Sequence, residues 1–237
     1  MSRTPTPDAR SSNDAALSLR ELRFRYLGGE SAAWVVDVPR LDLAAGEQML
    51  LRGGSGTGKS TLLNLVAGLM TPSSGTVRVK GTDIHALRGA ARDRFRGRTI
   101  GMIFQTFNLL QGFTAAENVM AALMFSDRPR GQHRDLARAL LTHLGITTPD
   151  REVSRLSVGQ QQRVAVARAV ACDPALVLAD EPTASLDPEN AGTAIELIQS
   201  ICREKNAALL CVSHDPTIAE RFERVERLEE LRSEAAA

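Results

Sequence analysis

The 237-residue sequence lacks several features that would place it in other protein classes. It has no apolar run approaching the ~18 residues that suggest a membrane-spanning helix. Its first residues contain no apolar segment typical of a signal peptide. Three widely spaced cysteines, Cys172, Cys202 and Cys211, predict reduced core thiols and neither a disulfide framework nor a zinc site. We therefore expect a cytoplasmic protein with no membrane span of its own.

The sequence also lacks an excess of charge of either sign. Twenty-nine basic and 28 acidic side chains give a formal net charge of +1. Such a balance provides no protein-wide field that would capture nucleic acid, so we expect no nucleic-acid partner. With 43% apolar residues, the chain can bury the core of one large domain, or of a domain with an inserted lobe.

The predicted elements alternate between strands and helices, which favours an α/β fold with a parallel central sheet. Two runs near the start, residues 17–26 and 34–43, resemble antiparallel strands at the edge of the fold. Further strands are predicted over residues 48–51, 76–79, 99–104, 175–179 and 207–212, and helices over 59–69, 160–171 and 188–203.

This order divides the chain into three segments. Residues 1–16 are rich in Ser, Thr, Pro and Asp and predict a disordered arm. Residues 17–224 form the main domain, with an α-helical subdomain inserted at about 106–160. Residues 225–237 form a short tail, and the spacing of Val225, Leu228 and Leu231 allows a short amphipathic helix over 223–234.

A glycine-rich loop between a predicted strand and a predicted helix carries the strongest motif. It matches G-x-x-x-x-G-K-[ST] without departure. In such a loop, backbone N–H groups cradle phosphates, the lysine bridges the β- and γ-phosphates, and the last hydroxyl reaches Mg²⁺. A flexible Gly/Ser turn is the alternative. The candidate ATP-binding residues are Gly53, Gly54, Ser55, Gly56, Thr57, Gly58, Lys59, Ser60 and the next residue, Thr61.

An apolar strand that ends in two carboxylates supplies the second motif. Asp180 and Glu181 follow the run 176–179. Ligands of open α/β sheets bind at the carboxyl ends of the strands. We therefore expect Asp180 to hold Mg²⁺ and Glu181 to act as the general base toward water. A strand that simply enters a loop is the alternative interpretation.

Residues Ser157, Val158, Gly159 and Gln160 open a predicted helix. A serine followed three residues later by glutamine is a capping box, so a well-capped helix is the structural alternative. The same geometry makes an anion site of the exposed N–H groups and the serine hydroxyl. Because the glycine loop already cradles one nucleotide, this second site is free to receive the γ-phosphate of a nucleotide on another molecule.

In this order, the motifs resemble those of ABC-transporter ATPase subunits from about residue 17 to residue 220. Leu156 to Gln160 is similar to the signature sequence of that family, and Gln105 is similar to its glutamine loop. The other matches are Tyr26 at the adenine-stacking position, the dimer-facing loop Ser185, Leu186 and Asp187, and the switch histidine His214.

The resemblance implies a P-loop NTPase (RecA-like) core and a catalytic role for Lys59, Glu181 and His214. It also implies Mg²⁺ contacts from Ser60, Gln105 and Asp180, and a head-to-tail homodimer with both ATPs at the interface. A transmembrane permease subunit would dock near residues 105–125. The protein would then be peripheral on the cytoplasmic face of the membrane. Individually, Gln105 and His214 could be ordinary structural residues, and Tyr26 a core residue.

One residue of the signature departs from the family pattern. Val158 stands where the family has its first glycine, and a β-branched residue does not readily adopt a positive φ. Ser157 and Gly159, to which the family assigns the γ-phosphate contact, are retained. We expect an active site with altered closure.

Within the family, the segments 107–110 and 113–119 resemble the lipoprotein-releasing and macrolide-exporting branch. Phe107, Leu109, Leu110 and Phe113 would form an apolar receptor for a helix of the membrane subunit, although at least half of them are expected to pack internally. The alternatives are a cell-division ABC ATPase that acts mechanically through a membrane partner, a soluble non-transport ABC ATPase, and a phosphate-loop kinase.

Overall fold

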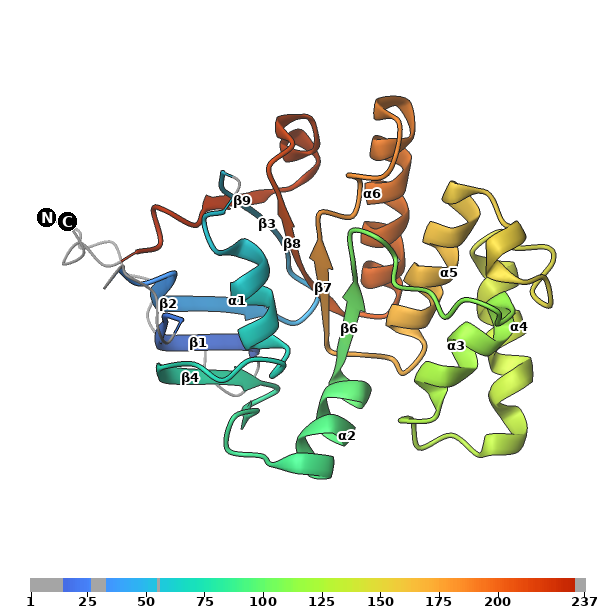
Figure 1. Ribbon diagram of the computed structural model, residues 1–237, viewed down its shortest axis with the longest axis horizontal. Coiled ribbons are helices and arrows are strands. Elements are labelled where there is room, and N and C mark those ends of the chain that lie inside the picture. Colours follow the sequence, from blue (N-terminus) through green and yellow to red (C-terminus); the bar gives the residue numbers. More distant parts are fainter. Residues whose placement is uncertain (1–14, 27–32, 55, 233–237) are drawn as a thin grey trace, which may run out of the picture.

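Figure 1 shows the computed structural model of the protein, which describes residues 15–26, 33–54 and 56–232. Most of the predicted N-terminal arm therefore lies outside the described residues, as does Ser55 of the glycine loop. The described chain forms two β-sheets, with helices around the larger one.

The first sheet is antiparallel and forms the edge predicted from the N-terminal runs. Leu19 on β1 lies opposite Leu41 on β2 and Val77 on β4, and all three side chains are buried. Because side chains alternate along a strand, these pairs direct one apolar face of the sheet to the core. The strands, in spatial order, are β2 (Val36–Ala44), β1 (Ala15–Phe24), β4 (Ser74–Val79) and β5 (Thr82–Asp83).

The second sheet is parallel and forms the centre of the protein. Its strands, in spatial order, are β6 (Ile100–Ile103), β7 (Leu176–Asp180), β8 (Ala208–Ser213), β3 (Gln48–Arg52) and β9 (Arg224–Arg227). β7 and β8 are almost entirely apolar and buried, as expected for parallel strands that are covered on both faces. All pairings are parallel, so the carboxyl ends of the strands share one edge. The predicted α/β architecture with an antiparallel edge is confirmed.

Helices cover opposite faces of the parallel sheet. Leu176 and Leu178 of β7 belong to one apolar cluster with α1 (Lys59–Val66) and the antiparallel sheet. Val177 and Ala179 belong to a second cluster with α5 (Val158–Val170) and α6 (Pro188–Glu204). Since successive strand residues point to opposite faces, α1 and α5 are separated by the sheet.

Two further helices, α3 (Ala115–Leu123) and α4 (His133–His143), lie beside α5. Figure 1 shows α3, α4 and α5 grouped on the side away from the antiparallel sheet. Thr114 caps α3 in a reciprocal capping box with Glu117. The sequence patterns gave no indication of α2 (Gly89–Thr99), which precedes β6 and has no fully buried residue. Short 3₁₀ helices are η1 (Arg130–Gln132), η2 (Val153–Arg155) and η3 (Pro216–Arg221).

The predicted amphipathic helix over residues 223–234 is wrong, because Arg224–Arg227 is strand β9. β9 pairs with β3 and covers the backbone groups along that edge of the sheet. Leu228 N then donates to Arg52 O at 2.9 Å. The apolar spacing suggested a helix, but Leu228 is 1% exposed whereas Val225 is 39% exposed. The segment predicted as a tail therefore begins inside the central sheet.

The described part of the chain contains neither a membrane-spanning helix nor a disulfide. None of its helices has the length and apolar character of a membrane-spanning segment. Cys202 and Cys211 are buried and free, as predicted for core thiols, whereas Cys172 is free but only half-buried. Burial raises the pKa of the Cys202 thiol to about 12.

Leu228→Ala is expected to lower the free energy of unfolding by about 2–4 kcal/mol, because it removes buried apolar surface and leaves a cavity. Val225→Ala, on the more exposed side of the same segment, is the matched control and should cost much less. Urea denaturation monitored by circular dichroism measures both values. Small and equal losses would show that the segment does not belong to the core.

Candidate active site

The glycine loop joins the end of β3 to the start of α1. Gly56 and Gly58 have φ values of +77° and +101°, a region that residues with a side chain rarely adopt. A Cβ on Gly58 would also lie 2.6 Å from Val35 O. Thr57 closes the turn, because its hydroxyl donates to Gly54 O at 2.9 Å. Glycine at position 58 is thus required by the backbone conformation and by the close approach of Val35, the residue before β2.

Lys59 is the first residue of α1, and its side chain lies along the loop. Its Nζ donates to the carbonyl oxygens of Gly53 at 2.8 Å and Gly54 at 2.7 Å. It lies 3.9 Å from a carboxylate oxygen of Glu181, and both side chains are largely buried. The positive end of the α1 dipole adds to the charge of this ammonium group. The loop therefore concentrates positive potential at the carboxyl edge of the sheet.

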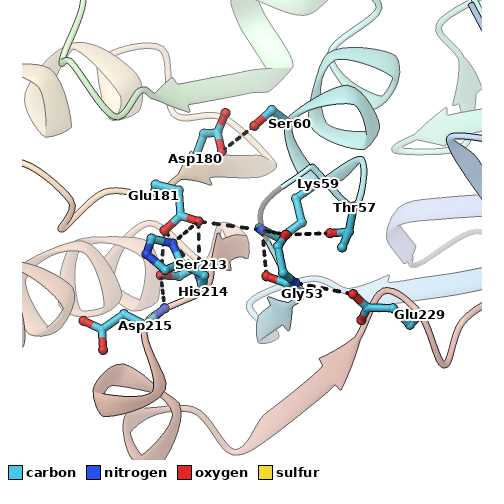
Figure 2. A network of polar contacts seen from close by, with 11 residues as sticks. Gly53, Thr57, Lys59, Ser60, Asp180, Glu181, Ser213, His214, Asp215 and Glu229 are labelled. Carbon is cyan, nitrogen blue, oxygen red and sulfur yellow. Dashed lines mark hydrogen bonds and ion pairs between the residues drawn. The ribbon is translucent and has the colours of Figure 1, made fainter.

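Asp180 ends β7 beside the first turn of α1. The Ser60 hydroxyl donates to Asp180 Oδ1 at 3.1 Å, as Figure 2 shows. Burial raises the pKa of the Asp180 carboxyl, and the neighbouring Glu181 charge acts in the same direction. The hydrogen bond from Ser60 and the charge of Lys59 oppose that shift. A hydroxyl and a partly desolvated carboxylate thus meet where a cation would be favoured.

The Glu181 carboxylate is the most highly coordinated group at this edge. It accepts a hydrogen bond from Ser213 Oγ at 2.8 Å and one from His214 N at 3.1 Å. The His214 ring Nδ1 lies 2.8 Å from Glu181 Oε1 (Figure 2). Glu181 has a φ of +45°, in the left-handed region, which directs its side chain back toward β8. The ends of β7 and β8 are thereby joined through one carboxylate.

Ser213 was missed in the sequence analysis. It is the last residue of β8 and is fully buried, and its hydroxyl also accepts a hydrogen bond from Asp215 N at 3.1 Å. Its position at the end of an apolar strand, directly before His214, is the only signal in the sequence. That signal does not distinguish a buried hydroxyl from an ordinary strand end.

Tyr26 lies beyond β1 and is 56% exposed, so the alternative that it is a core residue is wrong. Its ring packs edge-on against Phe24, with 4.9 Å between the ring centroids. Its hydroxyl lies 3.3 Å from Thr61 Oγ1 on α1. The side chain therefore stands beside the first turn of α1 with much of its surface open to solvent.

Gln105 follows β6, which pairs with β7 so that Ile103 lies opposite Ala179. The register places Gln105 at the same edge of the sheet as Asp180. The backbone carbonyl of Gln105 accepts a hydrogen bond from Ser185 Oγ at 3.0 Å. The loop after β7 thus contacts the loop after β6.

Ser157 caps α5 in the predicted capping box. Gln160 N donates to Ser157 Oγ at 3.3 Å, and Ser157 N donates to Gln160 Oε1 at 3.1 Å. Val158 is the first helical residue and is not among the described residues with positive φ. The expected conflict between its β-branched side chain and a positive φ is therefore absent here. Its side chain is 49% exposed.

A groove of about 560 Å³ separates the amino-terminal parts of α5 and α6. Asp187 occupies the N-cap position of α6 and Pro188 follows at N1, although the Asp187 side chain makes no capping bond. The predicted signature and dimer-loop residues that line this groove are Ser157, Val158, Gly159, Ser185, Leu186 and Asp187. The structure thus brings those two predicted segments together at one groove, whose lining includes no described residue of the glycine loop or α1.

The glycine loop, the acidic strand end and the surrounding parallel sheet define the chain as a nucleotide-binding protein of the P-loop class. The chain belongs to the ABC transporter family, whose model matches residues 36–184.

Relatives and solved structures extend this assignment over most of the chain. It is 39% identical over 233 residues to the lipoprotein-releasing system ATP-binding protein LolD of Chromohalobacter salexigens, which covers 98% of both chains. It is 43% identical over 214 residues to LolD of Anaeromyxobacter dehalogenans, which covers 90% of both. The ATP-binding cassette MJ0796, in a dimeric post-hydrolysis state bound to ADP and Pi, matches with a TM-score of 0.80 and 31% identity, over 92% of this chain and 96% of that one.

Asp180→Asn is expected to raise the melting temperature near neutral pH in metal-free, nucleotide-free protein. The pKa of Asp180 is raised in the folded state, so the folded protein binds this proton more tightly than the unfolded chain does. The contribution of Asp180 to stability therefore falls as the pH rises from the ordinary carboxyl value of 3.8 through the folded pKa. The advantage of Asn should shrink as the pH is lowered, in differential scanning fluorimetry at several pH values.

Asp215→Asn is the matched control with the opposite sign. The hydrogen bond from Thr217 N at 2.8 Å lowers the pKa of Asp215. Its stabilising contribution is present above the ordinary carboxyl value and is lost as the pH falls, so Asn at this position should lower the melting temperature at neutral pH. A destabilised Asp180→Asn protein at neutral pH would contradict the burial effect.

Proposed function

We propose that the protein is the ATP-hydrolysing subunit of an ABC transporter of the lipoprotein-releasing class. Two copies would close around two ATP molecules and move a membrane subunit. The family match and the two LolD relatives, each aligned over at least 90% of both chains, support this class. The observation that carries the enzymatic part is the Glu181 carboxylate, held by Ser213 and His214 beside the glycine loop.

ATP binding is assigned to the glycine loop and the start of α1. The backbone N–H groups of the loop and the helix dipole favour the phosphates, and Lys59 turns from the loop carbonyls to the β- and γ-phosphates. Thr61 stands next to the phosphate-binding residues. The exposed ring of Tyr26, 3.3 Å from Thr61 at its hydroxyl, supports stacking on the adenine.

Ser60 and Asp180 are assigned to Mg²⁺, with Gln105 as a further ligand. The 3.1 Å contact between the Ser60 hydroxyl and the Asp180 carboxylate brings together the oxygen donors that Mg²⁺ prefers. When bound, Mg²⁺ would neutralise negative charge that develops on the transferred phosphoryl group. Gln105 supplies an amide oxygen from the neighbouring loop at the same edge.

Hydrolysis is assigned to Glu181 and His214. Glu181 orients water toward the γ-phosphorus and takes its proton, while the bond between the γ-phosphorus and the bridging oxygen of ADP breaks. His214, whose ring is 65% exposed and contacts Glu181, turns toward the γ-phosphate. Lys59 stabilises the charge on the phosphoryl oxygens.

The second nucleotide contact is assigned to the partner copy. α1 and α5 lie on opposite faces of the sheet, which supports a role for the amino end of α5 toward another copy and not toward the glycine loop of its own chain. The exposed N–H groups near Ser157 and Gly159 suit the γ-phosphate bound by another subunit. The loop Ser185–Leu186–Asp187 beside them would complete the dimer contact.

The membrane subunit is expected to dock on residues 105–125, at the cytoplasmic face of the membrane. Of the four apolar residues considered there, Phe107 and Leu109 are buried and pack internally, as expected for half of them. Leu110 and Phe113 are 43% and 49% exposed and form the apolar part of this surface. Identification of a membrane protein that co-purifies with the chain would define the membrane partner.

Glu181→Gln is expected to bind ATP without turnover and to accumulate as a dimer in size-exclusion chromatography with ATP and Mg²⁺. Glutamine keeps the shape of the side chain but does not accept the proton from water. Glu204→Gln, at an exposed residue that pairs with His143, is the matched control and should behave like the wild type. A Glu181→Gln protein that stays monomeric with bound ATP would contradict the two-subunit site.

Lys59→Ala is expected to lower the ATPase rate by about a hundredfold or more, because it removes a preorganised charge at the transferred phosphoryl group. Lys205→Ala, which removes a surface ion pair with Asp173, is the matched control. A steady-state phosphate-release assay measures both. Retention of turnover in Lys59→Ala would show that ATP is hydrolysed elsewhere.

A further inference from the structure

The turn that begins at Gln105 has an unusual backbone. Phe107 and Asn108 have φ values of +59° and +47°, so two consecutive residues with side chains occupy the left-handed region. This conformation is unfavourable for Phe107, and asparagine tolerates it better. Within the turn, Phe107 N donates to Phe104 O at 3.0 Å. Such a conformation persists only where surrounding contacts impose it.

Arg168 provides that contact from the third turn of α5. Its Nη2 donates to Phe107 O at 2.6 Å and its Nη1 donates to Asn108 O at 2.5 Å. The guanidinium group thus holds the carbonyl groups of both left-handed residues at once. A planar fork of donors is suited to such a pair of acceptors, and a lysine ammonium is not.

The arginine makes no ion pair with any carboxylate in the described part of the chain. The guanidinium group is partly removed from solvent, and this burial lowers the pKa of Arg168. The two carbonyl groups that it contacts stabilise its charge. Placing an arginine here is unfavourable unless the position of the turn is important. The buried charge of Arg168 and the left-handed backbone of Phe107 and Asn108 therefore both indicate that the position of this turn is constrained.

A second bond holds the turn from its other end. Ser185 Oγ donates to Gln105 O at 3.0 Å. Ser185 lies in the loop that lines the groove beside Ser157, and Arg168 lies on α5, the helix that Ser157 caps. The backbone around Gln105 is thus fixed by the two elements that form the proposed partner-facing surface.

We propose that Arg168 is a positioning residue for Gln105: by holding the carbonyl groups of Phe107 and Asn108, it sets where the Gln105 side chain meets Mg²⁺. The inference rests on the proposed Mg²⁺ role of Gln105. In the structure the Gln105 side chain is exposed, and it makes no hydrogen bond to another described residue. Its position therefore depends on its backbone, and Mg²⁺ tolerates little departure from octahedral geometry.

Amide hydrogen exchange of the nucleotide-free protein tests the structural part. Arg168→Ala should accelerate exchange at the amides of Phe107, Asn108 and Leu110, because the turn loses its external hydrogen bonds. Arg224→Ala is the matched control, since Arg224 also donates to a backbone carbonyl, that of Asp42, but from the opposite edge of the sheet. Unchanged exchange of these amides in Arg168→Ala, or equal acceleration in both variants, would overturn the proposal.

The Mg²⁺ concentration that gives half-maximal ATP hydrolysis tests the functional part. It should rise by about tenfold in Arg168→Ala, as for loss of residues that orient a metal ligand. Arg168→Lys, which keeps the charge and most of the packing, should show a smaller rise and guards against a folding defect. Arg224→Ala should leave this midpoint unchanged even where it lowers the melting temperature.

Gln105→Ala separates the two hypotheses. If Gln105→Ala raises the Mg²⁺ midpoint but both Arg168 variants do not, Arg168 is structural and the inference fails while the proposed function stands. If Gln105→Ala leaves the midpoint unchanged, the Mg²⁺ role of Gln105 falls and the inference falls with it. A rise in both, with accelerated exchange of the turn confined to the Arg168 variants, supports the proposal.

Discussion

The register of three parallel strands determines where chemistry can occur in this protein. β3 pairs with β8 so that Arg52 lies opposite Ser213, and β8 pairs with β7 so that Val212 lies opposite Asp180. In this register the glycine loop, the acidic pair and the residues after β8 leave the sheet at one edge. A shift of one residue would turn every strand side chain to the other face. The hydrogen bond from Ser213 to Glu181 therefore depends on backbone pairing far more than on any local preference of these residues.

The same sheet lies between the two helices that begin at the predicted phosphate-contact segments. Its faces are covered by different apolar clusters, with α1 on one and α5 on the other. We therefore propose that an anion site at the amino end of α5 serves the glycine loop of a second copy. We propose that this separation makes association of two subunits part of the catalytic cycle, because each ATP is enclosed only when a second copy supplies its α5. Hydrolysis would then remove the ligand that holds the two copies together.

Features encoded by short segments could be predicted from the sequence, and features that depend on distant pairing could not. The glycine loop, the capping box at Ser157 and the strand before Asp180 each follow from local residue types. Residues 223–234 were predicted as a helix because Val225, Leu228 and Leu231 recur at helical spacing, but Arg224–Arg227 instead pairs with the open edge of β3. Ser213 and Arg168 act on residues 32 and about 60 positions away. Nothing in their immediate sequence identifies the carboxylate or carbonyl groups that they contact.

Several unfavourable conformations and charges lie along the edge where the nucleotide is expected. Glu181, Phe107 and Asn108 have left-handed backbones, and Asp180 carries a desolvated carboxylate. The two apolar clusters stabilise the fold sufficiently to offset the cost of these backbone conformations and of the desolvated carboxylate. Because a cation and a phosphate would relieve part of the electrostatic cost, we infer that the folded state gains stability when they bind. The electrostatic cost at this edge of the sheet is then highest in the free protein. Ligand binding lowers that cost, and the free energy gained can move the loops around the edge.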